Sequence, residues 1–217
     1  MVRRQVGFAI TVLLVAYAAH AQTAVPTMTF TFSFPGSQPD HYVISVSGDG
    51  HARYESDGKL SSDADSTPYQ RDFNVSPEFR SRLFDLAKRT HYFSGEIDSK
   101  KKGIASTGIK TLAYKDGQKS AEASYNYSPN PAVQELTGMF QGLANTLEFG
   151  HRLEYYHRYQ KLALADELKR MEDTDNGTSL QQVNAVSDIL RRIAEDQSVI
   201  NVVRMRAERL LQKAASH

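Results

Sequence analysis

Apolar and polar residues alternate with a period of two in two parts of the N-terminal half, residues 27–34 and 42–55. This period predicts half-buried β-strands, because successive side chains of a strand point to opposite faces. Gly48-Asp49-Gly50 interrupts the second stretch, which is typical of a β-hairpin. The alternation returns around Asp116-Gly117 in residues 109–125, and we predict a positive φ at Gly117. Two such hairpins favour one antiparallel sheet with a single covered face.

A further short strand is expected at residues 69–75. Tyr69, Phe73 and Val75 alternate there, but Arg71 shares their face. A charged residue on an otherwise apolar face favours a position at the sheet edge. With this segment the sheet has about five to six strands.

Helical spacing of apolar residues dominates the rest of the chain. Ser76-Pro77-Glu78 starts a helix that ends near Thr90, and Asn130-Pro131 starts another that runs to about Phe149. Gly150 is a candidate break, and residues 151–172 are helical again. After a turn at 173–178, residues 179–213 form either one helix or two, divided at Asp196-Gln197-Ser198.

The order of strands followed by helices predicts an α+β fold rather than a wound α/β fold. The sheet is expected to be covered by helices and followed by a C-terminal helical hairpin or bundle. We therefore divide the chain into an α+β sheet domain over 22–149 and a C-terminal helical extension over 150–217.

The first 21 residues have the pattern of a secretory signal peptide. Arg3 and Arg4 precede an apolar run from Val6 to Ala19, and Ala19-His20-Ala21 fits a cleavage site. Cleavage there removes two arginines and takes the formal charge from +1 to −1. We expect a bacterial protein exported to the periplasm or the extracellular space, with no membrane span after signal cleavage. Near-neutral charge gives no argument for nucleic-acid binding.

Residues 27–127 resemble secreted bacterial domains of unknown function. The shared features are the Y-x-I-x-V-x-x-D-G-x-x-x-Y strand pair from Tyr42 to Tyr54 and the T-G-x-K-x-L-x-Y-x-D-G hairpin from Thr107 to Gly117. No activity is attached to such domains, so the resemblance implies none here.

Short motifs give no cofactor or metal site. Asp63-Ala64-Asp65-Ser66-Thr67 matches a phosphatase nucleophile motif but lacks the preceding buried strand that this chemistry needs. Residues 172–177 resemble a calcium loop, but Val183 stands where a bidentate carboxylate is required. The chain has no cysteine, which excludes thiolate metal sites, disulfides and cysteine nucleophiles.

Two hypotheses for function follow. The first is a non-enzymatic binding or assembly module that meets a protein partner, itself or another chain, through its C-terminal helices. Tyrosine and arginine are common at interfaces. The expected partner surface is therefore Arg152, Tyr155, Tyr156, Tyr159, Ile200 and Val203. The alternative is a secreted hydrolase whose dispersed residues include His51, Asp57, His91 and Glu96. Absence of a catalytic motif favours the first.

Overall fold

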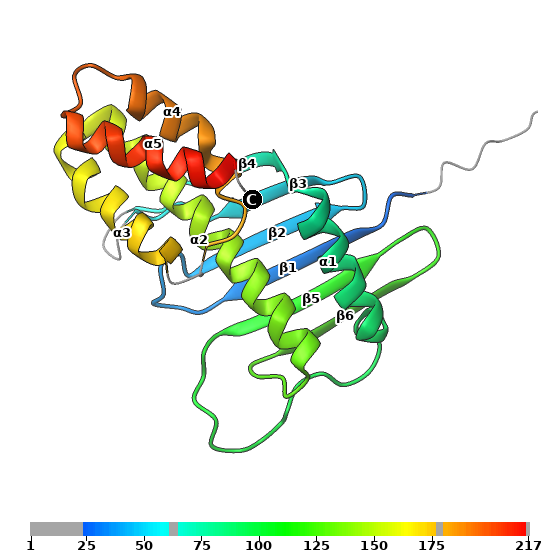
Figure 1. Ribbon diagram of the computed structural model, residues 1–217. Coiled ribbons are helices and arrows are strands. Elements are labelled where there is room, and N and C mark those ends of the chain that lie inside the picture. The colour runs from blue at the N-terminus through cyan, green and yellow to red at the C-terminus, as the bar shows by residue number, and fades with distance from the viewer. Residues whose placement is uncertain (1–23, 61–64, 177–179, 216–217) are drawn as a thin grey trace, which may run out of the picture.

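The computed structural model describes residues 24–60, 65–176 and 180–215 (Figure 1). The expected signal peptide, Asp63 of the phosphatase-like motif and Gly177 of the calcium-like loop lie outside these ranges. No helix among the described residues combines the length and apolar character needed to cross a membrane.

Six antiparallel strands form one sheet in the order β4-β3-β2-β1-β5-β6. The strands are β1 (Thr27–Ser33), β2 (His41–Ser47), β3 (His51–Ser56), β4 (Tyr69–Asn74), β5 (Ile109–Lys115) and β6 (Ser120–Tyr125). The predicted antiparallel sheet and the α+β class are confirmed. β4 lies at the sheet edge, as the charged Arg71 in its apolar pattern predicted.

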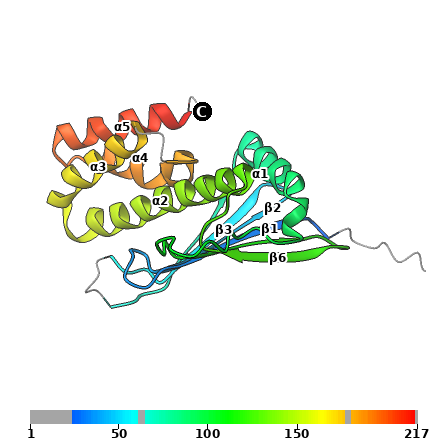
Figure 2. The same ribbon diagram turned by 90° about the horizontal axis from the view of Figure 1, so that it is seen from below.

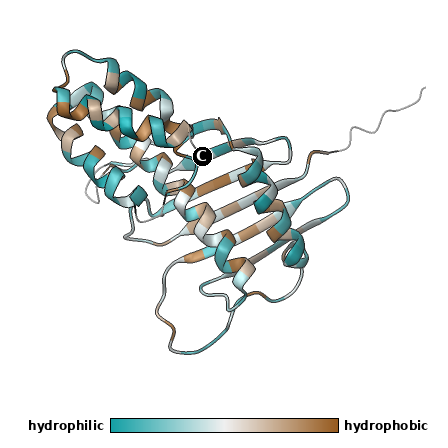
Figure 3. Ribbon diagram, in the orientation of Figure 1, coloured by the Kyte–Doolittle hydropathy of each residue, from teal (hydrophilic) through white to brown (hydrophobic). Residues whose placement is uncertain are grey.

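The period-two alternation determines which face of the sheet is covered. In the register of the central strand, Phe30 lies opposite Ile44 on β2 and Leu112 on β5, and all three are buried. The next residue, Thr31, faces the opposite side of the sheet. Helices α1 to α5 all lie on the apolar side (Figure 2). The apolar bands of the strands lie beneath α1 and α2 in Figure 3.

Helix α1 (Pro77–Arg89) begins and packs as its sequence predicts. The side chain of Ser76 accepts a hydrogen bond from the Phe79 amide at 3.2 Å and caps the helix. Phe79, Leu83, Leu86 and Ala87 are the buried residues of the helix. A 3₁₀ turn, η1 (His91–Phe93), follows and leads into the long loop before β5.

Helix α2 (Pro131–Tyr159) is a single helix of 29 residues, about 43 Å long at 1.5 Å per residue. It starts at the predicted cap, where Asn130 accepts from the Ala132 amide at 2.9 Å. The candidate break at Gly150 is wrong, because the helix continues through this residue. A Cβ at Gly150 would lie 2.4 Å from Cγ1 of Val186, so glycine serves close packing there.

The C-terminal helices form a bundle with the second half of α2. They are η2 (Lys161–Ala163), α3 (Leu164–Asn176), η3 (Val183–Val186), α4 (Ser187–Glu195) and α5 (Asn201–Ala215). The division of 179–213 therefore falls at residues 196–200, in agreement with the two-helix alternative. The buried apolar residues from Met28 to Leu210 form one continuous core cluster that includes both the sheet and the bundle. The proposed boundary at residue 150 lies inside α2.

The hairpin turn at Asp116-Gly117 differs from the prediction. Gly117 does not have a positive φ, whereas Gly50 in the other hairpin does, at +97°. The turn is instead organised by Asp116, whose Oδ1 accepts from the amides of Gln118 and Lys119 at 2.7 and 2.6 Å. This side chain closes the turn and removes the need for a left-handed residue.

Candidate functional site

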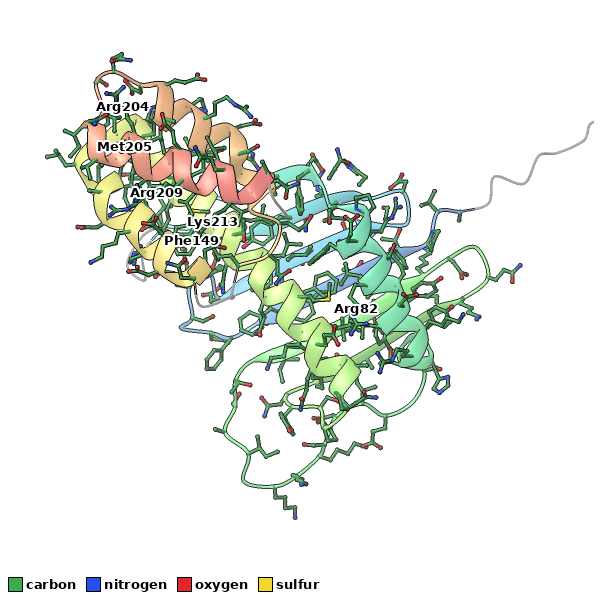
Figure 4. The ribbon with its side chains drawn as sticks, in the orientation of Figure 1. Arg82, Phe149, Arg204, Met205, Arg209 and Lys213 are labelled. Carbon is green, nitrogen blue, oxygen red and sulfur yellow. The ribbon has the colours of Figure 1, made fainter. Side chains whose placement is uncertain are left out.

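Five large apolar side chains are exposed together at the end of the bundle that lies away from the sheet. We call them the bundle end: Tyr159, Leu162, Ile200, Val202 and Met205. Leu162 is 91% exposed and Tyr159 is 62% exposed. The residues come from the end of α2, from η2, from the α4–α5 connection and from the start of α5. Figure 4 places Met205 and its neighbour Arg204 at this end of α5.

A polar cluster fixes the two connections that carry the bundle end. Nζ of Lys161 lies 2.6 Å from Oδ2 of Asp196 and 2.5 Å from the Ser198 hydroxyl. Nε2 of His157 lies 2.9 Å from the same Asp196 oxygen. Lys161 and Ser198 together hold the pKa of Asp196 well below its ordinary value. These contacts keep the α2–α3 and α4–α5 connections side by side, so the segments that carry the apolar side chains are neighbours.

Aromatic rings line the α2 side of this surface. The rings of Tyr155 and Tyr159 lie 5.1 Å apart, and the guanidinium of Arg158 lies 5.2 Å from the centre of the Tyr159 ring. Tyr156 is half-buried and packs against the core. Of the three predicted tyrosines, Tyr159 is the one most open to a partner, and Tyr155 supports it from the preceding helical turn.

Two predicted surface residues are buried or engaged instead. Val203 is 1% exposed and belongs to the core with Ala207 and Leu210. Nε of Arg152 contacts Oε1 of the buried Glu167 at 2.7 Å, and the guanidinium covers Phe149. Neither residue is available to a partner in this structure, whereas Ile200 is.

Sequence reasoning missed Leu162, Val202 and Met205. The helical stripe of Val203, Ala207 and Leu210 already indicated that residues 202 and 205 point elsewhere, since a helix advances 100° per residue. No comparable signal identifies Leu162, because it lies in the short 3₁₀ segment between two helices. No residue of η2 is buried, and Leu162 is exposed.

A second polar cluster lies buried between the sheet and α2. Oε1 of Glu148 accepts hydrogen bonds from the Tyr54 hydroxyl at 2.6 Å and from Ser56 at 3.0 Å, and Nδ1 of His151 lies 3.8 Å from Oε2. Burial acts to raise the pKa of Glu148, but these neighbours outweigh it and the pKa is lowered. Burial beside this carboxylate raises the pKa of Tyr54 far above its ordinary value, so the phenol stays a donor. This cluster joins β3 to α2.

The residues suggested for a hydrolase are not brought together. His51 lies 3.8 Å from Asp72 on the neighbouring strand, and Glu96 pairs with Lys100 at 2.6 Å. Asp57 accepts from the Asp40 amide at 3.3 Å. No hydrogen bond or ion pair between described residues joins any two of the four suggested side chains.

Neither a metal site nor a known relative identifies a function. Within the described ranges, no group of three or more His, Asp or Glu side chains is placed to hold a metal ion. The bundle end is the candidate site because its apolar side chains are exposed and polar contacts hold its two connections in place. No family model matches the chain, and no curated protein is similar enough to be counted as a relative.

Proposed function

We propose that the protein is an exported, non-enzymatic binding or assembly module that contacts a protein partner through its bundle end. The single observation that carries this proposal is the exposure of five large apolar side chains at one end of the bundle. Isolated exposed apolar residues are normal in soluble proteins, but a group of them is typical of an interaction site. The signal-like pattern of residues 1–21 supports export.

The chemistry of this surface suits protein recognition. Burying an exposed side chain such as Leu162 or Ile200 at an interface contributes roughly 1.5–3 kcal/mol to the free energy of binding. Tyr159 and Arg158 belong to the residue types that most often dominate binding energy at interfaces. The contacts of Lys161 with Asp196 and Ser198 hold the backbone in place before binding. Less conformational entropy is then lost when a partner docks.

Site-specific photo-crosslinking tests the proposal in the organism that makes the chain. A photoreactive amino acid replaces Leu162 in one variant and Val202 in another, and a third variant carries it at the exposed Ile109 on β5 as the control. We expect both bundle-end positions to give the same discrete protein adduct and position 109 to lack it. If positions 162 and 202 give no adduct beyond that of the control, the proposal is wrong.

Light scattering on the purified protein then decides whether the partner is a second copy. Closed two-fold pairing is the commonest arrangement of identical chains. In that case Leu162→Gln combined with Ile200→Gln converts a dimer into a monomer, while Ile109→Gln leaves the dimer intact. A wild-type monomer at high concentration assigns the adduct to a different protein.

A further inference from the structure

A groove separate from the bundle end runs along α2. One part of it, between α1, α2, residues 180–184 and the C-terminal ends of α3 and α5, has a volume of about 700 Å³. An adjoining part over α2, also of about 700 Å³, shares Arg82, Met139 and Gln181 with the first. We call the two together the amide groove. Arg82 points from α1 toward α2 in Figure 4.

The walls of the amide groove are fixed without a ligand. Oε1 of Gln182 accepts from the Ser76 amide at 2.6 Å, which ties residues 180–184 to the start of α1. The neighbouring Gln181 carbonyl accepts from the Thr146 hydroxyl at 2.7 Å, which ties the same segment to α2. The backbone of Gln181 is thus used for structure, whereas its side chain remains at the groove.

Four carboxamide side chains line the groove and make no hydrogen bond to the described part of the protein: Gln141, Asn145, Gln181 and Asn184. Each offers one acceptor oxygen and two donor hydrogens. Two ion pairs lie beside them: the guanidinium of Arg82 binds Glu135 through contacts of 2.5 and 2.6 Å, and Nζ of Lys213 lies 3.2 Å from Asp175. Glu78, in the first turn of α1, is exposed and also lines the groove. The hydrogen-bonding groups of the four amides themselves carry no charge.

Apolar side chains also line the groove. Phe79, Met139, Leu180 and Val183 contribute to its surface. At Gly138 on α2 a Cβ would meet nothing within 4 Å, so the helix backbone is open to the groove at this point. A glycine inside a helix costs roughly 1 kcal/mol relative to alanine. Packing within the described part of the chain does not require this glycine.

We propose that the amide groove binds an extended, uncharged polypeptide segment. A carboxamide has the same donor and acceptor groups as a backbone amide, so Gln141, Asn145 and Gln181 match the unpaired groups of an extended chain. The apolar residues accept an apolar side chain of that segment. A neutral oligosaccharide fits less well, because Phe79 is the one aromatic residue among those that line the groove and its ring is buried.

Nuclear magnetic resonance with two probes tests this site. The probes are the blocked peptide N-acetyl-Ala-Leu-Ala-Ala-amide and maltotriose, each titrated into the isotope-labelled protein. We expect the peptide to shift the side-chain amide signals of Gln141, Asn145 and Gln181 in a saturable way. Maltotriose should leave them unchanged.

Gly138 supplies a matched pair of variants. Gly138→Tyr fills the groove and should weaken peptide binding at least tenfold, whereas Gly138→Ala should stay within twofold of wild type. Gln181→Ala is the second test, because its backbone contacts to α2 remain and it removes one predicted hydrogen-bonding partner. It should weaken binding severalfold.

Three results would each overturn the proposal: no saturable shift with the peptide, equal affinity in Gly138→Tyr and wild type, or shifts with maltotriose instead of the peptide. The proposals for the groove and for the bundle end can be refuted independently of each other. Crosslinking from position 162 does not depend on Gly138, and peptide titration does not depend on Leu162.

Discussion

Two glycines of α2, Gly138 and Gly150, have opposite surroundings although both lie inside the same helix. Gly138 faces open space, whereas the missing side chain of Gly150 leaves room for Val186. Composition and spacing cannot separate these cases, since both glycines interrupt a helical pattern in the same way. The distinction depends on η3, a segment 36 residues further along the chain.

At the residue scale we therefore predict opposite effects of one substitution. Gly138→Ala should raise the free energy of unfolding by up to about 1 kcal/mol, because it restores helix propensity without new contacts. Gly150→Ala should lower it by roughly 1–2 kcal/mol, since overpacking against Val186 exceeds the propensity gain. Chemical denaturation of both variants measures the difference. Equal signs for the two changes would contradict the packing described here.

At the element scale, the hairpins and helix starts were predictable from sequence and the turn geometry was not. Ser76 and Asn130 cap their helices as expected, because capping depends on residues within one turn of the helix start. The Asp116-Gly117 turn was located correctly, but its stabilising residue is the aspartate. Local sequence does not decide between a left-handed glycine and an Asx turn, which satisfy the same backbone groups.

The corresponding prediction concerns the β5–β6 hairpin. Asp116→Ala removes the acceptor for two backbone amides and for the Tyr114 hydroxyl, which lies 3.0 Å from Oδ2. We expect a loss of about 1 kcal/mol in the free energy of unfolding. Gly117→Ala should change it by less than about 0.5 kcal/mol, because its Cβ would meet Ala24 at an ordinary 3.6 Å. Thermal unfolding of both variants distinguishes the two residues, and a larger effect at Gly117 would contradict the assignment.

At the scale of the whole molecule, α2 belongs to both layers. Its first half covers the sheet and its second half packs in the bundle, so one continuous core connects them. The sequence predicted the sheet and the helix starts after Ser76 and Asn130. The expected helix over 151–172 is wrong, because α2 ends at Tyr159 and α3 runs from Leu164 to Asn176, into the expected turn at 173–178. The sequence also did not predict that α2 would pack in both layers. Whether residues such as Val203 and Leu162 are exposed or buried depends on how separate helices pack against each other.

Glu148 gives the whole molecule a predicted acid sensitivity. The pKa of this carboxyl is lower in the folded protein than its ordinary value of 4.5. The unfolded chain therefore takes up the proton first as the pH falls, and the stability contributed by Glu148, complete above about pH 5, is lost below that value. Glu148→Gln should be less stable than wild type at pH 7 and should change less between pH 5 and pH 3.

Urea denaturation at several pH values measures this effect. Glu122→Gln on the exposed edge strand β6 is the control and should follow the wild-type pH profile. If Glu148→Gln loses as much stability as wild type between pH 5 and pH 3, the charged link between Tyr54 and α2 is not the source of the acid sensitivity.

The strand order has a consequence for how the chain must be made. Central strand β1 pairs with β2, which is synthesised soon afterwards, and with β5, which appears only after residues 34–108. Until β5 emerges from the ribosome, one edge of β1 has no neighbour. Until α2 emerges, much of the apolar face around Phe30 has no cover. A nascent or truncated chain that ends before residue 109 lacks both β5 and α2, so it combines a free strand edge with a bare apolar face. These two features favour aggregation.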